Sequence, residues 1–130
     1  MKIEHLALNV ADPLAMAAWY EEHLGLVAVK KMHESPFMIF LADDSGKIMI
    51  EIYQNPKASV LDFRSLDPLK LHLAFVSTDP GVDAQRLKRA GATEVSDDTL
   101  PDGTRLVMLR DPWGLALQLV KRAKDLLPNP

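Results

Sequence analysis

The chain has 130 residues, a formal net charge of −3 and no cysteine; 25% of its residues are charged and 48% are hydrophobic. A single domain of this length folds without disulfides or a structural metal, so any bound metal would serve function. The charges are dispersed, which leaves no basic patch for nucleic acid. No segment predicts a signal peptide or a membrane span, and we expect a cytoplasmic protein.

The first half of the chain predicts a strand, a helix and then further strands. The segment HLALNVADP, residues 5–13, starts in a predicted strand and ends at the start of a predicted helix. Asp12 is the helix N-cap, and Pro13 occupies the first helical position. Apolar residues recur at helical spacing as far as Leu24, and Gly25 ends the helix. A strand is expected near residues 26–32, followed by a hairpin over residues 37–53 with its turn at DDSG.

The second half repeats this order of elements. HLAFVSTDP, residues 72–80, matches HLALNVADP at an offset of 67 residues, so Asp79 and Pro80 predict the start of a second helix, which Gly91 closes. A strand near residues 92–96 and a hairpin over 104–120 complete the copy. Two βαβββ modules are therefore predicted, about residues 1–54 and 69–122, in a single domain. A proline-containing linker, about 55–68, joins them, and the tail 123–130 is expected to be a short helix or disordered.

Alternation along four of the strands separates an aliphatic face, suited to packing beneath a helix, from a mixed face that carries one polar side chain. The mixed-face side chains are His5, Glu51, His72 and Gln118. Each histidine precedes its partner by 46 residues, so both copies have the same arrangement. Singly, each is better explained as an ordinary residue of a half-exposed sheet. Together they favour a divalent metal site. The residues assigned to the aliphatic faces are Leu6, Leu8 and Val10 with Glu4; Ile48, Ile50 and Ile52; Leu69, Leu71, Leu73 and Phe75; and Leu115, Leu117 and Leu119.

Four further residues are candidates for the lining of a pocket beside these ligands, although packing in the core or at the rim explains each of them as well. Asn9, Met49 and Tyr53 lie on the mixed face, and Phe63 lies in the linker at the expected mouth of the pocket.

The segments IEHLALNVADP, IMIEIY, LHLAFVSTDP and RDPWGLALQLV resemble the vicinal oxygen chelate superfamily, which includes glyoxalases, bleomycin-resistance proteins and extradiol dioxygenases. The resemblance covers the chain from Lys2 to about Lys121. It implies an α+β fold in which paired βαβββ modules form a cup-shaped mixed sheet with the helices outside. It also implies metal ligands at His5, Glu51, His72 and Gln118, a small-molecule substrate or ligand, and a homodimer whose modules pair within one chain or between two.

The resemblance leads us to expect a small metal-dependent enzyme of the glyoxalase-like lyase or isomerase type. With no thiolate available, Zn, Ni, Co, Mn or Fe(II) is the expected metal. Metal enzymes of the superfamily usually have glutamate where this chain has Gln118. Because an amide cannot take up a proton, Glu51 is the expected catalytic base.

Two alternatives remain open. His5, His72 and Glu51 have the ligand composition of an Fe(II) extradiol-type dioxygenase. A metal-free ligand-binding protein similar to the bleomycin-resistance members is the other alternative, favoured by the lack of a carboxylate at position 118.

Overall fold

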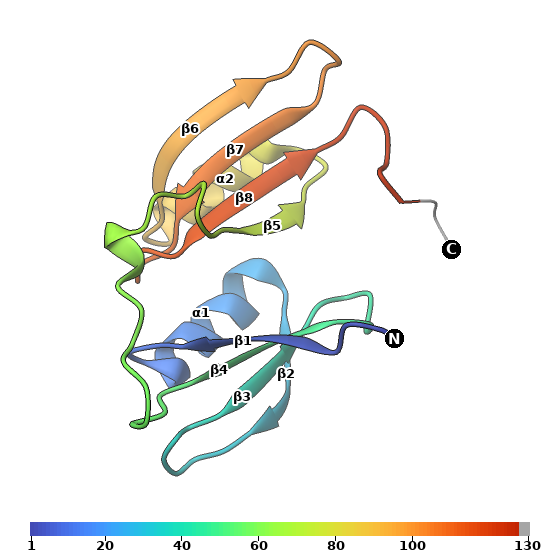
Figure 1. The fold of residues 1–130 in the computed structure, drawn as a ribbon. Coiled ribbons are helices and arrows are strands. Elements are labelled where there is room, and N and C mark those ends of the chain that lie inside the picture. The colour runs from blue at the N-terminus through green and yellow to red at the C-terminus, as the bar shows by residue number, and fades with distance from the viewer. Residues whose placement is uncertain (128–130) are drawn as a thin grey trace. The chain divides into compact units, whose positions relative to one another are not determined.

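The computed structural model describes residues 1–127, which form two compact units, Met1–Leu61 and the part of the chain that begins at Asp62. In the first unit the elements are β1 (His5–Asn9), α1 (Pro13–Leu24), β2 (Val27–Lys31), β3 (Ile39–Ala42) and β4 (Met49–Tyr53). In the second they are the short 3-10 helix η1 (Phe63–Ser65), β5 (Leu73–Val76), α2 (Pro80–Arg89), β6 (Thr93–Thr99), β7 (Arg105–Arg110) and β8 (Ala116–Lys121), as Figure 1 shows.

Each unit holds one four-stranded mixed sheet, and the two sheets have the same topology. The strand order is β1-β4-β3-β2 in the first sheet and β5-β8-β7-β6 in the second. The first strand of each unit runs parallel to the last, and the other neighbours are antiparallel. The α+β fold of repeated βαβββ modules is thereby confirmed.

The two helices begin where the sequence predicts. The carboxylate of Asp12 accepts a hydrogen bond of 3.1 Å from the backbone N–H of Ala15, and Asp79 accepts one of the same length from Val82. Each cap satisfies a backbone N–H that has no partner within its helix. Gly25 ends α1 in the left-handed region, with φ of 71°, where a glycine has no Cβ to clash.

The core of each unit lies between its helix and one face of its sheet. In the first unit α1 packs on β2, β3 and β4, and in the second α2 packs on β6, β7 and β8. Mid-strand residues predicted to be aliphatic and inward-facing, such as Leu8, Ile52 and Leu117, are buried. Leu69 is instead 85% exposed. The strand predicted to contain Leu69 begins only at Leu73, because residues 68–70 form a turn.

Both units have a β-bulge at the same place in the edge strand that follows the helix. The pairing register slips between Ala28 and Lys30 in β2, and between Glu94 and Ser96 in β6. Beyond each bulge, paired residues form a row across one face of the sheet. The row in the first unit is Lys30, Phe40, Glu51 and Ala7, and the row in the second is Ser96, Met108, Gln118 and Ala74.

The segment expected to be a linker is held by side chains of both units. Its first part hydrogen-bonds to Asn9 of the first unit. Its second part belongs to the second unit and contains η1, in which Phe63 is buried. Residues 123–127 of the expected tail form neither helix nor strand, and the last three residues lie outside the described part of the chain.

Candidate functional site

His5 and Glu51 meet on the face of the first sheet that α1 does not cover. His5 is the first residue of β1 and Glu51 the third of β4, where Glu51 is paired with Ala7 on one side and Phe40 on the other. The Nε2 atom of His5 lies 3.2 Å from Oε2 of Glu51. Their side chains are 33% and 17% exposed, so the pair is accessible from solvent without being fully hydrated.

The spacing of this pair fits two ligands of one metal ion. A histidine nitrogen and a carboxylate oxygen that are each about 2.0–2.2 Å from the same ion, with a ligand–metal–ligand angle of about 90–110°, lie about 2.9–3.5 Å apart. The observed 3.2 Å falls in that range. The other ring nitrogen of His5, Nδ1, lies 3.5 Å from Oε2 of Glu4. A carboxylate beside the second nitrogen is the usual support for a metal-binding histidine.

In the second unit, the backbone fixes the orientation of His72. Its Nδ1 atom lies 2.8 Å from the carbonyl oxygen of Pro68. A carbonyl can only accept, so Nδ1 carries the hydrogen and Nε2 of the neutral ring keeps its lone pair. Within residues 1–127, Nε2 has no hydrogen-bond partner. The imidazole is therefore in the tautomer that a metal ligand requires.

Gln118 occupies the position in the second unit that Glu51 occupies in the first. It lies in the middle of β8, paired with Ala74 on one side and Met108 on the other. His72 directly precedes β5. Each unit thus holds two of the four predicted ligands, and of these His5 and Glu51 are the two that the structure brings into contact. No cluster of three or more histidine, aspartate or glutamate side chains suited to a metal occurs in the described residues.

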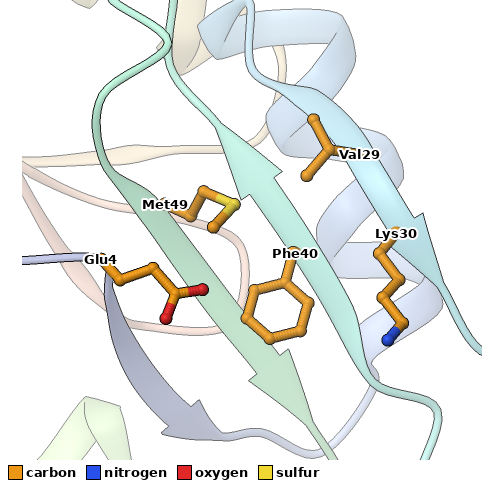
Figure 2. A pocket seen from close by; sticks show the side chains of 5 residues that line it. All are labelled: Glu4, Val29, Lys30, Phe40 and Met49. Carbon is orange, nitrogen blue, oxygen red and sulfur yellow. The ribbon is translucent and has the colours of Figure 1, made fainter.

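A small open pocket adjoins His5 and Glu51 on the same face of the first sheet. It has a volume of about 280 Å³, and Figure 2 shows its walls: Glu4, Val29, Lys30, Phe40 and Met49. The ring of Phe40 meets the imidazole of His5 edge to face, with centroids 5.4 Å apart and planes at 86°. Phe40 therefore belongs both to the pocket and to the packing of the candidate metal ligand.

The residues predicted to line a pocket have different surroundings. Met49 is a wall of the pocket just described. Tyr53 is half-buried at the end of β4, paired with Asn9. The side chain of Asn9 is hydrogen-bonded to the backbone of residues 55–59. Phe63 is only 5% exposed, and its carbonyl accepts a hydrogen bond from Arg110.

Four of the five pocket residues, all except Met49, were missed or misplaced in the sequence. Phe40 lies in the predicted hairpin, but counting by twos from Glu51 leads to Leu41 and Ile39; the pairing across the turn is what puts Phe40 on the face of Glu51. Glu4 was assigned to the aliphatic face, which is wrong, because it precedes the first residue of β1 and strand alternation does not extend to it. Val29 and Lys30 are adjacent in β2 and both line the pocket because of the bulge, for which the sequence has no glycine signal.

Comparison with known proteins identifies the family. The model of the Glyoxalase/Bleomycin resistance protein/Dioxygenase superfamily matches residues 2–119. The chain belongs to this superfamily. Neither helix of the described chain is long and apolar enough to cross a membrane. No curated protein sequence matches the chain.

Solved structures of the superfamily have the same fold. A member from Sphaerobacter thermophilus DSM 20745 is 15% identical, with a TM-score of 0.68, and the match covers 94% of this chain and 98% of that one. TnmS3, an antibiotic binding protein from Streptomyces sp. CB03234, is 18% identical, with a TM-score of 0.69 and coverage of 92% and 93%. Lactoylglutathione lyase from Agrobacterium tumefaciens is 20% identical, with a TM-score of 0.67 and coverage of 93% of both chains. At these identities the likeness concerns the fold alone.

Proposed function

We propose that this chain is a metal-dependent enzyme of the glyoxalase-like lyase or isomerase type. In this proposal His5, Glu51, His72 and Gln118 bind one divalent first-row metal ion, with the two units supplying a pair each, from one chain or from two. The observation that carries the proposal is the distance of 3.2 Å between Nε2 of His5 and Oε2 of Glu51, which suits two ligands of one ion. The tautomer of His72 supports it.

The proposed chemistry is a proton transfer next to a carbonyl group. When bound, a divalent ion would accept two neighbouring oxygens of the substrate and stabilise the negative charge that develops on them. Glu51 accepts the proton from the carbon beside the carbonyl and returns it to the neighbouring carbon, so no net proton is gained or lost. Gln118 cannot share this role, because its amide takes up no proton at neutral pH.

The other side chains of the site hold these groups in place. The edge of Phe40 restricts rotation of the His5 ring, and Glu4 lies beside Nδ1 of that ring. Pro68 restrains the ring of His72 in the same way through its carbonyl oxygen. Each histidine therefore has a second contact that orients the nitrogen proposed to bind the metal.

Metal content is the direct test. The untagged protein is purified without chelators, and the metal in wild type, His5→Ala, Glu51→Gln and His72→Ala is measured by mass spectrometry. We expect close to one first-row metal ion per site in wild type and loss of most of it in each variant. His33→Ala, which changes an exposed histidine outside the set, is the matched control and retains the metal. Wild type that takes up none of Zn, Ni, Co, Mn or Fe(II) would refute the proposal.

A second candidate function is ligand binding without chemistry. The neutral Gln118 and the largely apolar walls of the pocket favour it. Under this alternative, metal-free protein binds its ligand as tightly as metal-loaded protein. Bound iron, together with oxygen consumption in the presence of a catechol, would instead point to the dioxygenase alternative, in which His5, His72 and Glu51 are the ligands.

We also propose that the protein is a cytoplasmic homodimer, as the family resemblance implies. Light scattering coupled to size-exclusion chromatography tests the assembly, and the expected mass is twice that of one chain.

A further inference from the structure

The bulge in β2 turns one lysine toward the candidate site and leaves its neighbour facing the other way. Before the bulge, Ala28 pairs with Leu41, which is buried beneath α1; after it, Lys30 pairs with Phe40 and Lys31 with Ile39. Residues paired across antiparallel strands share a face, so Lys30 lies on the face of Phe40 and Glu51. Lys31 lies on the face of the buried Ile39. Without the slip in register, regular alternation would have put Lys31 on the face of Glu51 and Lys30 on the face covered by α1.

The ammonium group of Lys30 is available to a ligand. Lys30 makes no ion pair or hydrogen bond to a side chain among residues 1–127. The other charged wall of the pocket, Glu4, already lies beside Nδ1 of His5. Figure 2 shows the two charges on opposite sides of Phe40, with Met49 and Val29 completing an apolar surface between them.

The register also gives the distance from Lys30 to the proposed catalytic group. Lys30 and Glu51 belong to the same row, with β3 between their strands. Adjacent strands are about 4.8 Å apart, so the two backbones are separated by about 10 Å. A small aromatic or aliphatic body lying on Phe40 would span this gap. One of its ends would then face Glu51 and His5, and the other Lys30.

We propose that Lys30 is a specificity-determining residue that selects substrates with a carboxylate at the far end of a short apolar body. The assignment of the near end, two neighbouring oxygens at His5 and Glu51, rests on the proposed function. The recognition of the carboxylate does not, since it requires only Lys30 and the apolar wall. A lysine is suited to this task because its flexible stem lies along the wall while its charge stays at the rim.

The first experiment uses metal-free protein, so that it depends on the pocket alone. Binding of 3-phenylpropionate and of its neutral amide is followed by chemical-shift titration of the backbone amides. In wild type we expect the carboxylate to bind roughly three- to tenfold more tightly than the amide, with shifts at Lys30, Phe40 and Met49. Lys30→Met keeps the apolar stem and should abolish this preference. Lys31→Met, the matched control on the opposite face, should retain it. Equal binding of the two ligands by wild type, or a preference that survives in Lys30→Met, overturns the inference.

The second experiment separates this inference from the proposed function. Benzohydroxamate and 4-carboxybenzohydroxamate each present two neighbouring oxygens, and their affinities are measured calorimetrically with and without Zn. We expect both to bind more tightly when Zn is present, and only the carboxylated probe to lose affinity in Lys30→Met. A carboxylate preference without any gain from metal would overturn the proposed function and leave the role of Lys30 standing. If Zn raises the affinity of both probes but the carboxylate gives no preference, the role of Lys30 is overturned and the proposed function stands.

Discussion

Asn9 and Asn55 are hydrogen-bonded to each other in both directions. The side-chain nitrogen of Asn9 donates to the carbonyl oxygen of Asn55 at 3.2 Å, and the backbone N–H of Asn55 donates to Oδ1 of Asn9 at 2.7 Å. The same nitrogen of Asn9 also donates to the carbonyl oxygens of Ala58 and Ser59. One side chain at the end of β1 therefore holds the segment that leaves the first unit.

Asn9→Ala is expected to lower the free energy of unfolding by about 1–3 kcal/mol, because it leaves several polar backbone groups without their partner. Urea denaturation followed by circular dichroism measures the change. Asn55→Ala is the control: it keeps the reciprocal bonds, which use only the backbone of Asn55, and removes only the exposed hydrogen bond from the N–H of Lys57, so we expect a smaller loss. Equal losses in the two variants would show that the side chain of Asn9 has no special part.

Arg110 has the corresponding role in the second unit. Its guanidinium donates from Nη1 to the carbonyl oxygens of Phe63 and Gly114, both at 2.9 Å, and from Nη2 to that of Leu66 at 2.8 Å. Arg110→Lys is expected to lower the free energy of unfolding by about 2 kcal/mol even though the charge is kept. The single ammonium nitrogen of lysine cannot replace the two guanidinium nitrogens that donate these three hydrogen bonds. Arg89→Lys, at an exposed position of α2, should be neutral in the same urea titration.

Gly114 is required where η1 meets the β7–β8 turn. Its φ is 94°, and a Cβ built there would lie 3.1 Å from the backbone nitrogen and 3.2 Å from the Cα of Arg64. Gly114→Ala is expected to cost about 3 kcal/mol, since strain and overlap with backbone act together. Gly46 also has a positive φ, of 64°, but an added Cβ would meet nothing within 4 Å. Gly46→Ala should therefore cost only about 1 kcal/mol, and thermal unfolding of both variants tests the difference.

The ion pair between Asp97 and Arg105 predicts a pH dependence. Arg105 donates from Nε at 3.0 Å and from Nη2 at 2.7 Å, and these hydrogen bonds hold the pKa of Asp97 below its ordinary value of 3.8. A lowered pKa in the folded state stabilises the fold at pH values above 3.8, and this contribution is lost as the pH falls through the folded pKa. The pair is substantially exposed, so the effect is small.

Arg105→Met tests this dependence through its urea midpoint at two pH values. We expect a slightly lower midpoint than wild type at pH 7 and a smaller difference at acidic pH, as the carboxylate of Asp97 becomes protonated. Arg89→Met, on α2, controls for loss of an exposed arginine, because Arg89 makes no ion pair within residues 1–127. A difference that stays constant with pH would exclude the ion pair as its cause.

Gln118→Glu tests the proposed metal site at Gln118, the one of the four proposed ligands that is a neutral amide. A carboxylate at this position adds a negative charge beside the cation, and we expect metal affinity to rise roughly tenfold or more, as measured by competition with a chelator. Gln85→Glu adds the same charge on the exposed side of α2 and should leave the affinity unchanged. An unchanged affinity in Gln118→Glu would exclude position 118 from the metal site.

Local signals in the sequence were sufficient for the repeated fold. The caps at Asp12 and Asp79 and the turn glycines act within a few residues, so they can be recognised without knowing the tertiary structure. Alternation placed His5 and Glu51 on one face, and the structure has them 3.2 Å apart. The limits of the strands were less predictable. Residues 69–71 were expected in a strand, but the turn before β5 takes them out of it.

The face of the sheet on which Lys30 lies could not be predicted from the sequence either. Its face depends on which residue of β2 pairs with Phe40, and that register is set by contacts between strands rather than by the residues of β2 themselves. Alternation likewise assigns residues to the faces of one sheet and contains no information about which faces of two sheets associate. The grouping of four ligands therefore remains a prediction that rests on the repeat.

The shared bulge has an evolutionary consequence. Immediately after a duplication, the two copies would carry the same residues in the rows beyond the bulges. The rows now differ at three of four positions, with Lys30 against Ser96, Phe40 against Met108 and Glu51 against Gln118. If Lys30 contributes about 1.4 kcal/mol to binding of a carboxylate, the first unit binds that ligand tenfold more tightly than a unit without the lysine. Divergence of a few codons would thus have given one of two identical copies a ligand preference of its own.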